Sequence, residues 1–146
     1  MAKEGQKVKA GDTLLTFDAD VSRKRKETLE TQIQLEEKRF EEESRAIKAR
    51  KRGVIERVNG LTRSLNTESS IYTNILPLAE IGAMQQTEVL RQRNRVEQLE
   101  SEVLVAEADL EEVEAQLNKL EQESLREISD LERQLVEVQD TIKKER

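Results

Sequence analysis

Apolar residues recur along most of the chain at the seven-residue spacing of a two-helix coiled coil. Such a repeat predicts a narrow apolar seam and left-handed supercoiling. In the first half of the chain the seam positions are Ile33, Phe40, Ile47, Val54, Leu61 and Leu65. In the second half they are Val96, Leu99, Val103, Leu110, Val113, Leu117, Leu120, Ile128, Leu131, Leu135 and Val138.

The second of these two ladders is interrupted at Ser124, and beyond it the alternate apolar positions shift by one residue. A shift of this kind is typical of a stutter, at which the supercoil unwinds locally.

A turn is predicted between the two ladders. Pro77, the only proline, removes a helix hydrogen bond, and Gly82 suits a left-handed helix C-cap. From Glu88 the amphipathic pattern resumes. We therefore predict an all-α fold, a long antiparallel two-helix coiled-coil hairpin with an ascending arm at 19–81, a tip at 82–86 and a descending arm at 87–146.

The two ladders also predict a register. Facing residues in a hairpin centred near Met84 have numbers that add to about 168. Leu65 then meets Val103, and Ser44 falls opposite Ser124 at the stutter.

Two zones weaken the ascending arm. Gly53 and Gly60 each cost about 1 kcal/mol relative to alanine in a helix, and the stretch 64–70 is polar, so that Asn66 or Thr67 could cap a new helix. Two helices remain an alternative to the single, locally distorted helix that we favour.

The composition of the chain excludes most kinds of catalytic and metal-binding site. The chain has no cysteine and no histidine, which excludes thiolate nucleophiles, imidazole catalysis and the usual zinc sites. No nucleophile–base pair is present, so we expect neither an enzyme nor a bound cofactor or metal.

The chain has a net charge of -6 and 2% aromatic residues. The basic runs 23–26 and 50–52 are therefore interpreted as solvated helix faces, and no nucleic-acid partner is expected. No apolar run reaches the length of a membrane span and no signal peptide opens the chain, which we interpret as a segment of a longer protein.

Residues 3–18 have a different, β-prone pattern. Short apolar runs are separated by a Gly-Asp turn signal, and the pattern consists of Gly5, Val8, Gly11, Asp12, Leu14 and Leu15. Two short strands are not stable alone. We therefore expect residues 1–18 to be mobile, paired with another chain, or drawn into the helix.

This pattern resembles the first half of a biotinyl/lipoyl-like domain. In membrane fusion proteins of the HlyD type, a long helical hairpin splits the two halves of that domain and no cofactor is attached. The chain lacks the Met-Lys-Met hairpin of the carrier domains and passes directly into helix, as in the HlyD type. The resemblance implies that residues 1–18 are an incomplete lipoyl-like domain.

The turn carries a second resemblance. Residues 75–90 are similar to the tip of type I secretion adaptors, which typically read Leu-Glu-Pro-Leu-Val, two polar residues, Gly-Ala-Val-Ser, two more residues and Glu-Val-Leu. Drug-efflux adaptors instead carry Arg, Leu and Ser where this chain has Asn74, Leu78 and Gln85, so that only the leucine is kept. The resemblance implies a channel-docking tip made of Asn74, Leu78, Ile81, Gly82, Ala83, Met84, Gln85 and Gln86.

The family resemblance implies a function in export. Its members are periplasmic adaptors, anchored in the inner membrane, that bridge an ABC transporter and a TolC-like outer-membrane channel and associate as hexamers. We expect such a type I secretion adaptor for protein export. The alternatives are an adaptor of a tripartite drug-efflux pump, a generic structural coiled-coil rod, and a subunit of a biotin- or lipoyl-dependent enzyme.

Overall fold

The protein is built from two long helices. The computed structural model describes the backbone of residues 2–144 and the side chains of residues 18–144. Helix α1 spans Ala2–Glu80 and helix α2 spans Gln86–Lys144. No strand occurs between residues 2 and 144. The all-α prediction is therefore confirmed, as is the packing of two long helices against each other.

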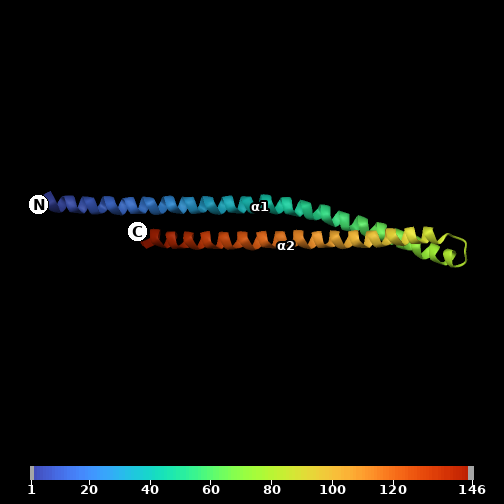
Figure 1. Cartoon of the computed structure of the whole chain (residues 1–146). Helices are drawn as coiled ribbons and strands as arrows, with labels where there is room; N and C mark the ends of the chain where they lie inside the picture. Colours follow the sequence, from blue (N-terminus) through green and yellow to red (C-terminus); the bar gives the residue numbers. More distant parts are fainter. Residues whose placement is uncertain (1, 145–146) are drawn as a thin grey trace. The chain divides into compact units, whose positions relative to one another are not determined.

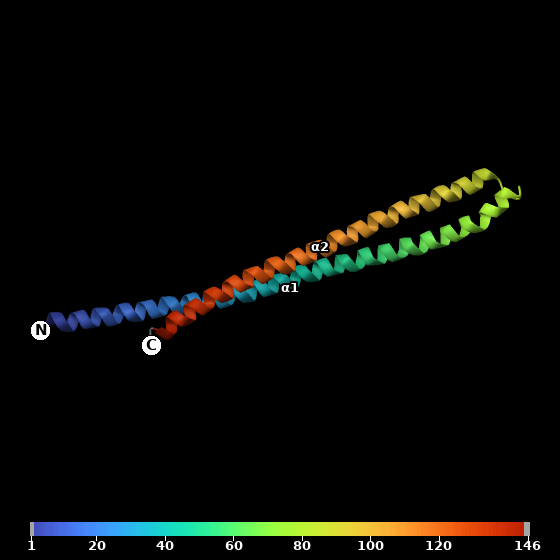
Figure 2. The same ribbon diagram turned by 90° about the horizontal axis from the view of Figure 1, so that it is seen from below.

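The helices divide into two compact units. Unit 1 comprises residues 1–44 and 119–146, and unit 2 comprises residues 45–118. Within each unit the segments of α1 and α2 lie side by side and run in opposite directions (Figures 1 and 2). In unit 1, the N-terminal part of α1 extends past the end of α2 in both views.

The prediction of short strands between Lys3 and Asp18 is wrong for this structure, because α1 begins at Ala2. Of the three fates expected for this segment, the structure shows the helical one. Strands need further strands to pair with, and the described chain offers none, whereas a helix closes its hydrogen bonds within itself. The side chains of Gly5, Val8, Gly11, Asp12, Leu14 and Leu15 lie outside the described residues.

Helix α1 is continuous through the two weak zones of the ascending arm. Thr67 does not cap a new helix: its Oγ1 donates a hydrogen bond to the backbone carbonyl oxygen of Arg63 at 3.1 Å. Ser70 and Thr73 donate in the same way to the carbonyl oxygens of Asn66 and Ser69. Hydroxyl groups that bond to the carbonyl four residues earlier are compatible with an unbroken helix. The single-helix alternative is therefore the one observed.

The core of unit 2 is a narrow apolar seam. Val96, Val103, Ala106 and Val113 on α2 are buried. The remaining predicted seam residues of this unit are half-buried, namely Ile47, Val54, Leu61, Leu65, Leu99, Leu110 and Leu117. In unit 1, Leu29, Leu120 and Val138 are buried, and the half-buried positions are Ile33, Phe40, Ile128, Leu131 and Leu135. Because two helices enclose little space, most apolar side chains keep one edge in water.

Polar pairs along the rim give the register of the helices. In unit 2, Arg57 Nη1 lies 3.8 Å from Asp109 Oδ2, and Arg50 Nη1 donates to Gln116 Oε1 at 3.1 Å. In unit 1, Arg39 Nη2 lies 3.8 Å from Glu127 Oε2. The residue numbers of these three pairs each add to 166, two less than the predicted 168. Nearer the turn, those of Arg95 and Glu68 add to 163.

Two serines occupy the seam of unit 1. Ser44 on α1 and Ser124 on α2 are 6% and 4% exposed. Ser44 Oγ donates to the carbonyl oxygen of Glu41 at 3.1 Å, while Ser124 Oγ is buried without a hydrogen-bond partner. The interruption of the apolar ladder at Ser124 therefore places a polar atom in the core.

Candidate functional site

The turn between the helices is fixed by a Schellman motif. Gly82 has a φ of 78°, in the left-handed region that suits glycine. The N–H of Gly82 donates to the carbonyl oxygen of Ala79 at 3.2 Å, and the N–H of Ala83 donates to that of Leu78 at 2.8 Å. These two bonds satisfy carbonyls that the end of a helix leaves unpaired. The turn is therefore set by local backbone chemistry.

Helix α2 starts immediately after this motif. The carbonyl oxygen of Gln85 accepts hydrogen bonds from the N–H groups of Glu88 at 3.1 Å and Val89 at 3.4 Å. Glu88 places a negative charge in the first turn, where the helix dipole favours it. The chain thus reverses between residues 81 and 85.

The tip presents apolar and amide side chains to solvent. Ile81 is 77% exposed, more than any other large apolar side chain described, and Leu78 is 40% exposed. The other residues predicted for the tip are exposed except the half-buried Met84, namely Asn74, Gly82, Ala83, Gln85 and Gln86. The structure gathers residues 81–86 at the turn, while Asn74 and Leu78 lie on α1 before it. Aliphatic side chains therefore lie beside exposed amides at this end of unit 2.

A shallow groove lies between α1 and α2 beside the tip, and sequence reasoning missed it. Its volume is about 270 Å³. The lining residues are Tyr72, Leu76, Ala79, Glu80, Gln86, Val89, Leu90 and Arg93. Leu76 and Leu90 are 38% and 54% exposed. The groove continues the exposed apolar surface of the tip along the helices.

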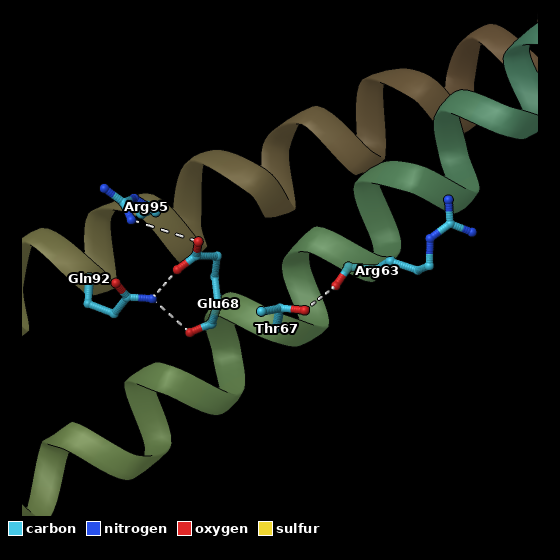
Figure 3. Close-up of polar contacts among 5 residues, drawn as sticks. All are labelled: Arg63, Thr67, Glu68, Gln92 and Arg95. Atoms are coloured by element: carbon cyan, nitrogen blue, oxygen red, sulfur yellow. Dashed lines mark hydrogen bonds and ion pairs between the residues drawn. The ribbon is translucent and has the colours of Figure 1, made fainter.

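A polar layer crosses the seam farther from the tip (Figure 3). Gln92 on α2 is 9% exposed, and its Nε2 donates to the backbone carbonyl oxygen of Glu68 on α1 at 2.9 Å and to Glu68 Oε2 at 2.5 Å. Arg95 Nη1 lies 3.8 Å from Glu68 Oε1. The same view shows the bond between Thr67 and Arg63. The helices are therefore joined by directed bonds at this layer.

The polar layer was also missed, although the sequence contains a signal for it. Gln92 falls between Val89 and Val96 at the alternate spacing of three and four residues, where an apolar residue is expected. A glutamine at such a position indicates a buried hydrogen-bonding partner on the facing helix. Only the structure identifies that partner as Glu68.

Among residues whose side chains are placed, no three acidic, histidine or cysteine side chains are grouped to hold a metal ion. Neither helix, over its described length, contains a stretch long and apolar enough to cross a membrane. The candidate site is the group of exposed apolar and amide side chains at the tip.

Comparison of the chain with models of known protein families, with curated proteins and with solved structures finds no match.

Proposed function

We propose that this chain is the hairpin segment of a periplasmic adaptor that serves type I secretion. It would bridge an inner-membrane ABC transporter and a TolC-like outer-membrane channel, with the tip of unit 2 docking on the channel. The observation that carries the proposal is the exposure of Leu78 and Ile81 at a turn whose backbone is fixed by hydrogen bonds. A preorganised apolar tip loses little conformational entropy on docking.

The neighbouring residues support an interface at this end. Gln85 and Gln86 are exposed beside the apolar pair and offer amide donors and acceptors. An apolar centre with a polar rim is the usual anatomy of a protein–protein contact. The resemblance of residues 75–90 to secretion adaptors supplies the class of partner.

A photo-crosslinking experiment tests the contact directly. Benzoylphenylalanine is placed at Ile81, and the chain is irradiated with a purified TolC-like channel. The matched control carries the same group at Leu104, which is 66% exposed and lies away from the tip. We expect a crosslink to the channel from position 81 only. A crosslink from position 81 to a second copy of the chain alone would favour the structural coiled-coil rod.

An export assay separates the two adaptor alternatives. Leu78→Asp combined with Gln85→Ala should lower export of a protein substrate in cells that contain the transporter and the channel. The control combines Leu104→Asp with Gln98→Ala, which makes the same chemical changes at exposed positions of α2. Unchanged protein export with increased drug sensitivity would instead favour the efflux-pump adaptor.

A further inference from the structure

Two carboxyl groups from different helices of unit 1 lie close to the same arginine, Arg39. Glu36 on α1 and Glu127 on α2 line one groove together with Gln32, Leu35, Arg39, Asp130, Leu131 and Gln134. The Glu36 side chain is only 11% exposed, whereas that of Glu127 is 58% exposed. Glu36 Oε1 is buried and accepts no hydrogen bond. A carboxylate in this position lacks the solvation that ionised groups require.

The positive charge in the groove does not balance its acids. Arg39 Nη2 lies 3.5 Å from Glu36 Oε1 and 3.8 Å from Glu127 Oε2. The Nε of the same arginine lies 3.6 Å from Glu43 Oε1. Asp130, the other acid of the groove, pairs with Arg133 on its own helix at 3.7 Å. One guanidinium is therefore shared by three carboxylates.

The surroundings favour a proton on Glu36. Burial raises the pKa of Glu36 above its ordinary value, and a hydrogen bond to the Glu127 carboxyl raises it further. The negative charges of Glu127 and Glu43 act in the same direction, while Arg39 opposes them.

We propose that Glu36 and Glu127 form a proton-operated clasp between α1 and α2 in unit 1. With one proton bound, the two carboxyls hold the helices together through a hydrogen bond. When that proton is lost, two carboxylates repel each other across the groove. This regulatory device goes beyond the proposed docking function and does not depend on it.

The sign of the effect follows from linkage. A group whose pKa is raised on folding contributes stability that is complete below its unfolded pKa and is lost as the pH rises through its folded pKa. Unit 1 is therefore held more firmly as the pH falls through the raised pKa of Glu36 toward the ordinary glutamate pKa of about 4.3. At lower pH the other carboxylates also become protonated and their ion pairs are lost.

Carboxyl NMR tests the shared proton. In the full chain with ¹³C-labelled glutamate, Glu36 is assigned through Glu36→Gln and its titration midpoint is measured. We expect the midpoint to lie above the ordinary glutamate pKa of about 4.3 and to fall in Glu127→Gln. Glu132→Gln is the matched control and leaves it unchanged. An unshifted Glu36 midpoint, or one that Glu127→Gln does not lower, overturns the proposal.

Distance measurements test the mechanical consequence. The chain has no cysteine, so spin labels can be attached at Gln34 and Ser129, which are exposed in unit 1 and do not line the groove. With unlabelled chain in excess, we expect a narrower distance distribution just above the ordinary glutamate pKa of about 4.3 than at pH about 7.5. Glu36→Gln should give the narrow distribution at both values. A wild-type distribution that is independent of pH, or a pH response that persists in Glu36→Gln, overturns the clasp.

Discussion

The side-chain amide of Gln92 on α2 holds Glu68 on α1 by two hydrogen bonds, one to its backbone carbonyl oxygen at 2.9 Å and one to its carboxylate at 2.5 Å. The two residues fix one relative position of the helices in unit 2, because sliding either helix would break both bonds. A buried polar pair of this kind sets register at a cost in stability.

Replacing Gln92 by alanine should destabilise the protein. The change removes both bonds and leaves the Glu68 carboxylate, whose side chain is 22% exposed, without its buried partner. We expect a loss of about 1–3 kcal/mol in the free energy of unfolding, measured by urea denaturation. Gln98→Ala is the control, because Gln98 is exposed and bonds only weakly to Glu102 on its own helix, at 3.4 Å. An equal effect of the two variants would contradict the assignment.

Replacing both residues of the layer by leucine should have the opposite effect on stability. In the double variant Glu68→Leu, Gln92→Leu, the apolar seam becomes longer and no buried polar side chain is left unpaired, so we expect stability equal to the wild type or higher. Arg95 loses its ion pair with Glu68, but its side chain is 64% exposed and stays solvated. The register should become less specific. Cysteine crosslinking between the two helices of unit 2 should then give several pairings instead of one, and a single pairing would show that the apolar seam alone sets the register.

Two glycines should respond to alanine in opposite directions. Gly82→Ala forces a side chain into the left-handed region and should cost about 1–2 kcal/mol. Gly53 lies within α1, and an added Cβ there meets nothing within 4 Å, so Gly53→Ala should stabilise by about 1 kcal/mol. Thermal unfolding followed by circular dichroism measures both. A stabilising Gly82→Ala would mean that the turn does not need its left-handed residue.

Ser124→Ala should stabilise unit 1. The Ser124 hydroxyl is buried without a hydrogen-bond partner, and removing such a group avoids a desolvation cost on the order of 1–3 kcal/mol. Ser129→Ala, at an exposed position five residues further along α2, should leave the unfolding midpoint nearly unchanged. A destabilising Ser124→Ala would show that the hydroxyl makes a favourable contact in solution.

Several features follow from local rules and were predictable. The seven-residue spacing predicts helices that pack along one stripe, because residues so spaced lie on one face of a helix. The left-handed turn residue was identified at Gly82, since only glycine adopts that conformation without strain. The register came within two residues at pairs far from the turn, such as Arg57 and Asp109, but not near the turn, where Glu68 pairs with Gln92.

Other features of the structure could not be predicted from local sequence rules. The Gly-Asp signal near the N-terminus predicted strands, but strands depend on partners elsewhere and the segment is helical. Thr67 was a candidate N-cap, yet its hydroxyl bonds within an unbroken helix. The role of a polar residue such as Gln92 or Glu36 depends on what faces it, and the spacing along one helix does not contain that information.

The sequence alone determined that the chain forms two amphipathic helices joined by a turn at Gly82, because periodicity and backbone conformation are properties of neighbouring residues. Tertiary structure decided which polar groups meet across the seam. Gln92 meets Glu68, Arg39 meets Glu127, and Ser124 Oγ meets no hydrogen-bond partner. These pairings depend on the exact height and rotation of one helix against the other, which the apolar stripe restricts only to within a few residues.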